Sequence, residues 1–432
     1  MQAGAAPGGR IMLKTVLRKL AQISRRIYVR VIMFAVLDVI ALLGAVALSP
    51  FIPDGAGSFI GADAVDTILR VLASSMLAVT TFSLTIMTAA FANAASNWTP
   101  RSHLVLREDT VTHSVLATFL GSYMFALVAI VMRAAGLFDH RGIVVLFFVT
   151  IAVVLAIVVS IIRWIVRLEG LGSLPFTAAR LEEEAGRAMR RAAVRPCHGG
   201  HCLRDPATQI PAGAVAITGA GHGYVQQIFE AALQSWAEAN GARVYVPVSV
   251  GEYVQTGDVL AHVVCDGEPD ARAVETLREA IPVRDVRSFE QDPVFGISVL
   301  AEIATRALSP GINDPGTAID VAHRISHVLR CRGADDGDGG GAPEYDRLWC
   351  VALDPDELFR SSYDPISREA GDCVEVQIAV QNALRAVVAG LDGAMAQAAR
   401  DCAARCRDRA VGAIRDAADR DLFRERLGDG GA

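Results

Sequence analysis

Residues 31–52 read VIMFAVLDVIALLGAVALSPFI, an apolar run that contains a single charged residue, Asp38. Three more apolar runs follow, at 67–95, 111–132 and 143–165. Each run reaches the roughly 20 residues with which a helix crosses the hydrocarbon core of a bilayer. Because lipid offers the backbone no hydrogen-bond partners, such segments must be helices rather than open sheet. The sequence therefore predicts a four-helix transmembrane domain over 31–165, preceded by a basic segment at 1–30.

The arginines and lysines are distributed unevenly among the segments that connect these helices. The N-terminal segment is rich in them, whereas the loop at 53–66 has none and contains three aspartates. The loop after the third run contains Arg133 and Arg141, which weakens this difference. Since positively charged loops stay in the cytoplasm, we expect the N-terminus and the C-terminal domain to be cytoplasmic. The alternative is a signal peptide cleaved near Ala45–Ala47, which the length of the run and the three later spans disfavour.

The rest of the chain reads as a soluble, mixed sequence. An amphipathic helix and linker occupy 166–207, a small α+β module follows at 208–266, and 267–432 is a mainly helical domain that ends in a long helix at 393–419. A flexible Gly/Asp-rich loop is expected at 333–343. The fold class is thus a membrane α-helical domain followed by a cytoplasmic α+β, mainly helical, domain.

Within the small module, Gly251 and Gly257 punctuate the strands expected at 243–250 and 254–264, and the series Val250-Gly251, Val254, Gly257, Leu260 and Val263 resembles the half-motif of lipoyl-like barrel-sandwich hybrids. In such a domain the half-motif is a hairpin that folds an apolar face inward. The carrier lysine of such a domain is missing, so any likeness is structural.

Composition and charge exclude several classes of function. The net charge of −6 comes without a basic stripe, so no nucleic-acid partner is expected. The two lysines, Lys14 and Lys19, both precede the first span, so the soluble part can neither form a Schiff base nor carry a lipoyl or biotinyl group. No nucleophile elbow, phosphate-binding glycine loop or pair of catalytic carboxylates is evident. We therefore expect neither an enzyme nor a cofactor.

The second span carries a stripe of small and hydroxylated residues spaced by four and three positions. These residues share one helix face, and they are Ser74, Ala78, Thr81, Thr85 and Thr88, continued by Ala92 and Ser96. Such a face lets membrane helices pack closely. It could instead line a water-filled path, because hydroxyls replace the hydration of an ion at little desolvation penalty. Both readings remain open.

Two charges lie within the spans. Asp38 falls about two turns into the first span, and Arg70 about one turn into the second. A charge at this depth is costly, and it marks either a functional residue or a structural hydrogen bond. Arg70 is long enough to reach the interface, whereas Asp38 is not.

Two groups of residues are weak metal-ligand candidates. Cys197 and Cys202 bracket the sequence CHGGHC, although its spacing is tight for one tetrahedral site and a variable loop is the simpler reading. Asp320, His323 and His327 share a helix face, without the glutamate of a zinc-protease motif. We expect no metal at either, and we expect the cysteines of a cytoplasmic domain to be reduced thiols.

The sharpest local sequence is the helix stop and restart at 306–318, RALSPGINDPGTA. Asp314 stands at the N-cap position of the next helix with Pro315 at its first position, and Asp292-Pro293 repeats this arrangement one helix earlier. Capping alone could explain both aspartates. A binding site for a partner or small ligand is the alternative, and its residues would be Asp292, Arg306, Ser309, Asn313, Asp314 and Thr317.

These segments carry a resemblance to a known family. Together with 81–85 in the second span and 223–226, the segments 292–296 and 306–318 resemble the bacterial predicted integral membrane proteins catalogued as domain of unknown function 2254. The resemblance covers most of the chain. It implies several spans and a cytoplasmic domain, without an assigned activity. We expect such a chain to lie in the bacterial inner membrane.

Two hypotheses follow. In the first, the protein is a homo-oligomeric channel or permeation pathway for ions, bordered by the second span and tuned by Asp38 and Arg70, with a cytoplasmic domain for assembly or gating. In the second, the spans anchor a scaffold or ligand sensor in the lipid bilayer. The stripe discriminates between them: burial against the other helices of the same protomer would weaken the first hypothesis.

Overall fold

The computed structural model describes residues 27–51, 62–97, 99–101, 104, 110–170, 173–332 and 342–428. The chain divides into two compact units, one formed by the helices of the apolar N-terminal part and one formed by Thr177–Ala432 with Asn97–Val105. Of the loop predicted at 333–343, residues 333–341 lie outside the described part of the chain, as do residues 1–26 of the basic segment.

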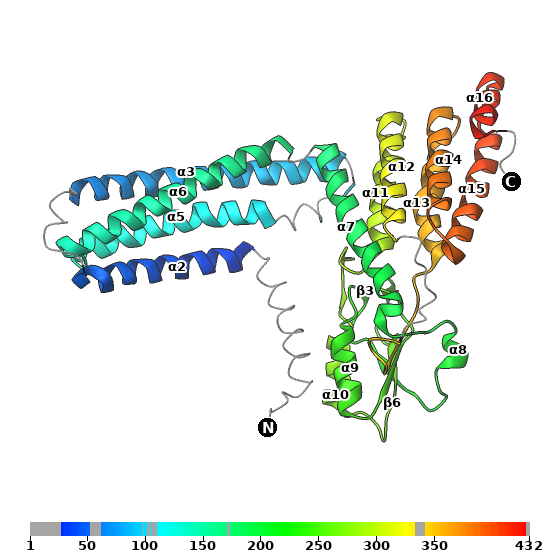
Figure 1. Ribbon diagram of the computed structural model, residues 1–432, viewed down its shortest axis with the longest axis horizontal. Helices are drawn as coiled ribbons and strands as arrows, with labels where there is room; N and C mark the ends of the chain where they lie inside the picture. Colours follow the sequence, from blue (N-terminus) through cyan, green and yellow to red (C-terminus); the bar gives the residue numbers. More distant parts are fainter. Residues whose placement is uncertain are drawn as a thin grey trace. The chain divides into compact units, whose positions relative to one another are not determined.

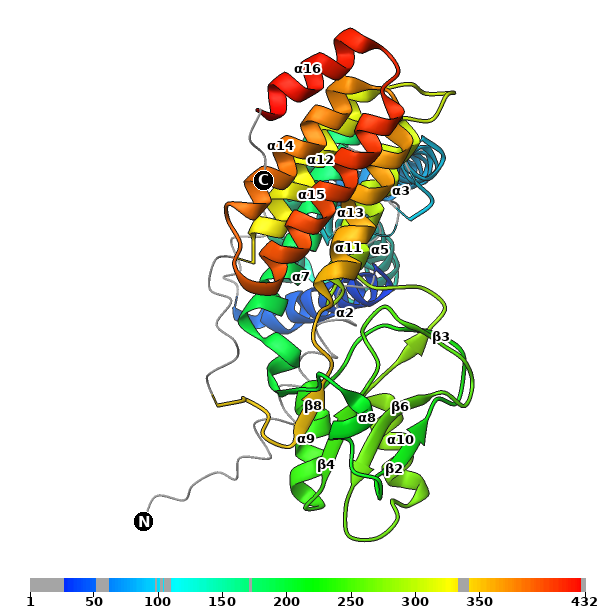
Figure 2. The same ribbon diagram turned by 90° about the vertical axis from the view of Figure 1, so that its right-hand side faces the viewer.

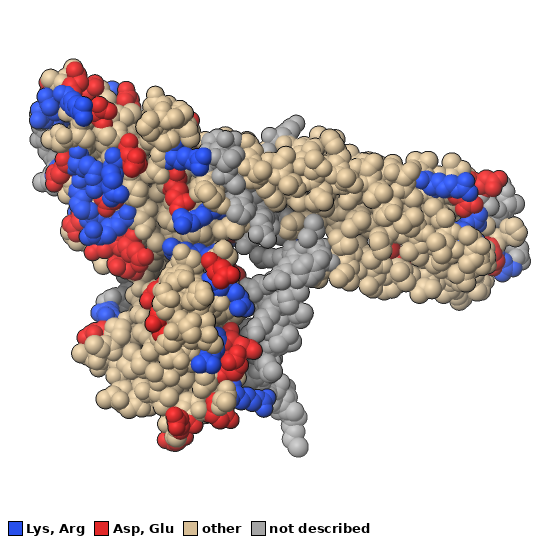
Figure 3. All heavy atoms as spheres, turned by 180° about the vertical axis from the view of Figure 1, so that it is seen from behind, with Lys and Arg blue, Asp and Glu red and all other residues tan. Residues whose placement is uncertain are grey.

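The first unit consists of four helices that are long and apolar enough to cross a membrane, as predicted. They are α2 (Ile27–Leu48), α3 (Ala62–Asn97), α5 (Thr110–Ala134) and α6 (His140–Gly170), and they lie side by side (Figure 1). The core between them contains Leu42, Phe119, Phe125 and Leu146. Charged side chains are sparse along the face of this unit drawn in Figure 3. Many large apolar side chains on the outside of this unit are exposed, and such a surface suits contact with lipid rather than with water.

One face of α3 packs into this core. Its buried residues are Val65, Leu69, Leu72, Met76 and Met87, which repeat at helical spacing. The helix has 36 residues and is therefore about 54 Å long at a rise of about 1.5 Å per residue. This exceeds the roughly 30 Å of a hydrocarbon core, so α3 is longer than a single crossing requires.

The second unit begins with the amphipathic helix α7 (Leu174–Val194). Leu181, Ala185 and Met189 form its buried face. The neighbouring helix α11 (Pro293–Ala307) approaches α7 so closely that a Cβ atom on Gly296 would lie 2.6 Å from the Cβ of Ala185. Only glycine fits at this contact.

A five-stranded mixed sheet and a three-stranded sheet make up the β part of this unit (Figure 2). The first has the order β1-β8-β4-β6-β2, in which β8 runs parallel to both of its neighbours. The second has the order β5-β3-β7 and is antiparallel. The strands are β1 (His201–Cys202), β2 (Val215–Thr218), β3 (Gly223–Val225), β4 (Arg243–Val246), β5 (Tyr253–Val254), β6 (Val259–Val264), β7 (Val283–Arg284) and β8 (Leu348–Cys350).

The predicted strands at 243–250 and 254–264 do pair, because β4 runs antiparallel to β6 with Arg243 opposite Val264 and Tyr245 opposite His262. A hairpin within the glycine-marked series at 250–263 is wrong, because β5 pairs with β3 in the other sheet rather than with β6. The short helices of this region are α8 (Pro206–Gln209), α9 (Glu230–Ala239) and α10 (Ala271–Glu279). Leu233 of α9 and Leu277 of α10 pack into the same core as the strands.

The remaining helices form a bundle beside the sheets (Figure 2). Besides α11 they are α12 (Pro315–Arg330), α13 (Pro355–Ala370), α14 (Val374–Val388), α15 (Gly393–Ala413) and α16 (Ala417–Leu427). α11 packs on α12 and α13, and α14 packs on α12 and α15. The single helix predicted at 393–419 is in fact two, because Ile414 is extended and Asp416 caps a new helix.

Candidate functional site

The stripe on α3 faces away from the other helices of its own unit. Ser74, Ala78, Thr81, Thr85 and Thr88 are all exposed, on the side of α3 opposite to its buried face. Their hydroxyls donate to carbonyls one turn earlier in the same helix, over 2.8–3.0 Å. The hydroxyl groups of the stripe are therefore hydrogen-bonded within α3 and need no partner on another helix.

The two predicted intramembrane charges differ in their surroundings. Arg70 is exposed and lies one turn before Ser74, on the stripe side of α3. Asp38 is half-buried, and its Oδ2 atom is enclosed without a hydrogen-bond partner. A Cβ atom on Gly121 of α5 would lie 3.5 Å from that oxygen, so a small residue there leaves room for the carboxyl group.

In the second unit, Cys197 and Cys202 form a disulfide. The prediction of reduced thiols is therefore wrong for these two residues, and disulfide sulfurs are not the thiolates that a metal requires. The spacing of the two cysteines is compatible with a disulfide. The chain also has to reverse between them, and it does so through a turn in which Cys197 and His198 have positive φ angles of 50° and 59°.

A buried carboxylate, Glu230 at the start of α9, connects this loop to the rest of the unit. Its Oε1 atom accepts hydrogen bonds from Arg191 of α7 at 3.1 Å and from Gln291 at 2.9 Å, and it lies 3.4 Å from Nδ1 of His198. Burial raises the pKa of Glu230, but the contacts with His198 and Arg191 outweigh it and hold the pKa below its usual value. Glu230 is thus an ionised group that joins four segments.

Asp292 lies next to Gln291 and is 1% exposed. It accepts two hydrogen bonds from Arg287, at 2.8 and 2.9 Å, and caps α11 through the amide of Phe295. Burial raises the pKa of Asp292 to about 6, against the opposing effect of Arg287. A Cβ atom on Gly251 would lie 2.2 Å from the Asp292 carboxylate, so only glycine permits this pair.

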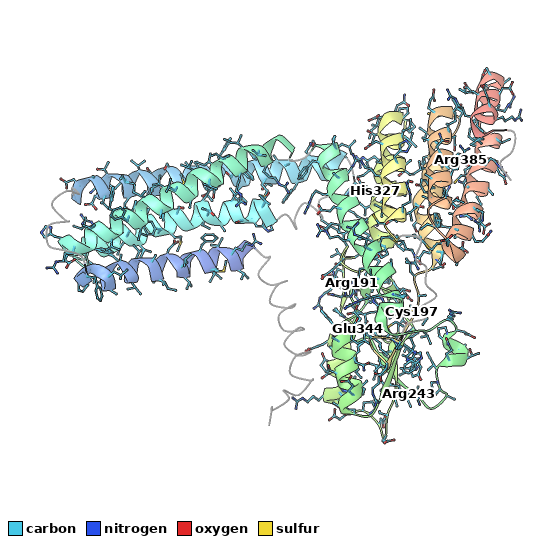
Figure 4. All side chains as sticks on the ribbon, viewed as in Figure 1. Arg191, Cys197, Arg243, His327, Glu344 and Arg385 are labelled. Carbon is cyan, nitrogen blue, oxygen red and sulfur yellow. A yellow bond between two sulfur atoms is a disulfide. The ribbon has the colours of Figure 1, made fainter. Side chains whose placement is uncertain are left out.

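These groups line one cavity of about 1520 Å³. Its wall includes Arg191, His198, Glu230, Arg287, Asp292 and the disulfide loop. The labels of Arg191, Cys197 and Glu344 mark this part of the molecule in Figure 4. A polar cavity of this size with buried charges is able to accept a small polar ligand. Sequence reasoning found Asp292 and the cysteines, but missed Glu230 and Arg287 because nothing local marks them.

The turn at 308–314 is held together by its own bonds. Asn313 has a φ of 50°, and the amide of Asp314 donates to the carbonyl of Ala307. Asp314 accepts from the amide and the hydroxyl of Thr317, which lowers the pKa of its carboxyl group. Ser309 donates to the carbonyl of Arg306. The predicted N-caps at Asp292 and Asp314 are confirmed, while a ligand site at this turn stays a prediction.

The weak metal candidates on α12 do not converge. Asp320 pairs with Arg324, and Nδ1 of His327 lies 2.6 Å from Glu182 of α7, while His323 is exposed. His327 therefore serves a contact between α12 and α7.

Among the described residues, a single group of three side chains lies close enough to share a metal ion. It consists of Asp364, Cys402 and Cys406, all buried, with the two sulfurs 3.9 Å apart. Both oxygens of Asp364 already accept hydrogen bonds from Arg405 and Arg409. This arrangement is an ion-pair cluster with two thiols beside it.

The chain is similar to several known proteins. The family described as Predicted membrane protein (DUF2254) matches residues 24–386. Uncharacterized protein Rv1290c of Mycobacterium tuberculosis and Uncharacterized protein Mb1321c of Mycobacterium bovis are each 32% identical to it over 122 residues, which cover 27% of this chain. The aligned part covers 23% of each relative, so the chain spans about a quarter of the length of the curated relatives it matches. No solved structure matches the chain.

Proposed function

The chain belongs to the family described as Predicted membrane protein (DUF2254), and we propose that it forms a homo-oligomeric channel or permeation pathway for ions. The soluble unit assembles or gates this pathway, and the proposal assigns it no catalytic activity. In the proposed orientation, the N-terminus and the soluble unit lie on the cytoplasmic side of the bacterial inner membrane, in agreement with the distribution of arginine and lysine.

The orientation of the α3 stripe carries this proposal. A small, internally satisfied face such as that of Thr81 and Thr85 would be expected inside a helix bundle. Here it is exposed, so it is available to a second copy of the chain, to water or to lipid. Four helices enclose no wide conduit, and a closed ring of copies would supply one. In such a ring α3 borders the axis, and Arg70 stands at one end of the stripe.

The experiment is ion flux through liposomes that contain the purified protein, compared with the variant Thr81→Leu/Thr85→Leu. The larger side chains fill the stripe, so we expect flux to fall at least tenfold while the oligomer persists. The matched control is Val71→Leu/Leu84→Phe, which adds bulk at exposed positions on the flanks of the same helix. Equal flux from both variants would contradict the proposal.

A second candidate function rests on the cavity of the soluble unit. A cavity lined by the buried carboxylates Glu230 and Asp292 suits a membrane-anchored sensor of a small polar ligand. Absence of flux from intact oligomers, across several ions and at both acidic and alkaline pH, would favour this sensor or scaffold over the channel.

A further inference from the structure

The disulfide between Cys197 and Cys202 lies in the wall of the cavity rather than in a core. Cys197 is buried and Cys202 is half-buried, and both line the cavity. Cys202 is therefore the more exposed of the two residues on the side of the cavity.

The backbone around the bond is held in an unfavourable conformation. Cys197, His198 and Gly199 have successive φ angles of 50°, 59° and 79°, and the first two are not glycine. The left-handed region is sparsely populated by such residues, and it persists only where the surroundings enforce it. Gly200 contributes to this, because a Cβ atom there would lie 2.5 Å from the carbonyl oxygen of Leu348.

A structural role explains this bond poorly. A disulfide restricts the unfolded chain more when it closes a longer loop, and these cysteines are separated by only five positions. In the cytoplasm thiols are kept reduced, and disulfides found there are usually transient, catalytic or redox-sensing. The cytoplasmic placement proposed above therefore sets this bond apart from the disulfides of secreted proteins.

We propose that Cys197–Cys202 is a redox-active disulfide that exchanges with a low-molecular-weight thiol entering the cavity, an inference that rests on the cytoplasmic placement of the soluble unit. The thiolate of the small molecule attacks the sulfur of Cys202, the bond between the two cysteines breaks, and Cys197 leaves as a thiolate that takes up a proton. A second small thiol then attacks the mixed disulfide and releases Cys202. Two small thiols are oxidised to their disulfide, and two cysteine thiols form.

A third cysteine is close by but does not compete. Cys350 of β8 is paired in register with Cys202 of β1. It is fully buried, and burial raises the pKa of its thiol far above the usual range. It therefore stays protonated, and a protonated thiol is a poor nucleophile.

Opening the bond would reach beyond the loop. His198 is the residue that contacts Glu230, and Glu230 in turn accepts from Gln291, the neighbour of the α11 cap Asp292. Reduction lets Cys197 and His198 return to right-handed or extended backbone and so withdraws His198 from Glu230. The contact between His198 and Glu230 would then link the redox state of the disulfide to the start of α11.

The test uses the purified full-length protein in detergent, equilibrated in buffers of reduced and oxidised glutathione and alkylated while still folded, before mass spectrometry. We expect Cys197 and Cys202 to become alkylated together in buffers of cytosolic ratio, while the buried Cys350, Cys402 and Cys406 stay protected. A bond that stays closed in fully reduced glutathione would overturn the proposal, and so would alkylation of Cys197 and Cys202 only under conditions in which the buried thiols are alkylated too.

A second readout follows the loop itself. Trp349 stacks on His201 with ring centroids 4.5 Å apart, so its fluorescence reports on the end of the loop. Reduced wild type and the variant Cys197→Ser/Cys202→Ser should share one spectrum that differs from that of the oxidised protein. The variant Cys265→Ser/Cys373→Ser, which alters two half-buried free cysteines, is the control and should behave as wild type. A spectrum that reduction leaves unchanged would count against the proposal.

Neither readout depends on ion flux or oligomer formation, so failure of the channel proposal and failure of this one are separable. The side of the membrane is determined independently, by the accessibility of cysteines to a membrane-impermeant reagent in spheroplasts.

Discussion

Arg133 of α5 donates two parallel hydrogen bonds to Asp66 of α3, from Nε to Oδ1 at 2.8 Å and from NH2 to Oδ2 at 2.7 Å. The two side chains are 15% and 31% exposed. This pair joins α3, the helix with the exposed stripe, to α5. Arg133 is also one of the two arginines that weaken the charge difference between the two sides of the membrane, and Asp66 neutralises its charge.

Breaking this pair should loosen α3. We expect Arg133→Met and Asp66→Leu each to lower the free energy of unfolding by about 1–3 kcal/mol, because each leaves a partly buried charge without its partner. The double variant should lose less than the sum of the two, with a coupling of about 1–2 kcal/mol. Unfolding of the four proteins in mixed detergent micelles measures this cycle, and strict additivity would show that the pair contributes nothing.

Gly251 should tolerate no side chain. Gly251→Ala places a methyl group against the Asp292 carboxylate at a φ of 90°, so we expect it to displace the Arg287–Asp292 pair and to lower the free energy of unfolding by about 2–4 kcal/mol. Gly257→Ala is the matched control, because its φ is 94° but no atom lies within 4 Å of the new methyl group.

The control should show the backbone strain alone, about 1–2 kcal/mol. Thermal unfolding followed by circular dichroism compares the two variants. Equal losses of unfolding free energy in the two variants would mean that the structure accommodates the methyl group beside Asp292 at no cost in stability.

The two aspartate caps should differ in their importance. Asp292→Ala removes a cap and leaves Arg287 half-buried without its partner, and we expect a loss of about 2–4 kcal/mol. Asp314 is exposed and caps α12 without an ion pair in the described structure, so Asp314→Ala should lose only about 1 kcal/mol. Chemical denaturation of both variants gives the comparison, and a larger loss for Asp314→Ala would argue for a role of the turn beyond capping.

Glu230 should make stability depend on acidity. Its pKa in the folded protein lies below the usual 4.5, so its contribution is present in full above that value and is lost as the pH falls through the folded pKa. Glu230→Gln should abolish this part of the dependence and should lower the melting temperature at neutral pH, where His198 and Arg191 lose an ionised partner. Melting temperatures between pH 3 and pH 7 test this, and parallel curves for both proteins would refute it.

The sequence specified those elements whose information is local. The four apolar runs, the amphipathic pattern of α7 and the Asp-Pro caps of α11 and α12 each depend on residues within a few turns of one another. The stripe on α3 could be located from spacing alone, but its direction could not, because that depends on which face carries Val65, Leu69 and Met76 into the core.

The candidate site was less accessible to such reasoning. Glu230, Arg191 and Gln291 come from three separate segments, and no local pattern announces that they converge. The hairpin within the glycine-marked series at 250–263 failed for a similar reason: β5 and β6 follow one another in the sequence, and only their partners place β5 beside β3 and β6 between β4 and β2. The disulfide depended on left-handed backbone at Cys197 and His198, which those residue types rarely adopt.

The position of β8 has a consequence for biosynthesis. This strand lies inside the five-stranded sheet, between β1 and β4, yet the ribosome produces it only after α11 and α12. Until Leu348–Cys350 has emerged, β4 has an unpaired edge, and its hydrogen-bonding groups are open to another chain. A nascent or prematurely terminated polypeptide that ends before this strand is therefore the species most exposed to aggregation and to chaperones, although all its other strands have been made.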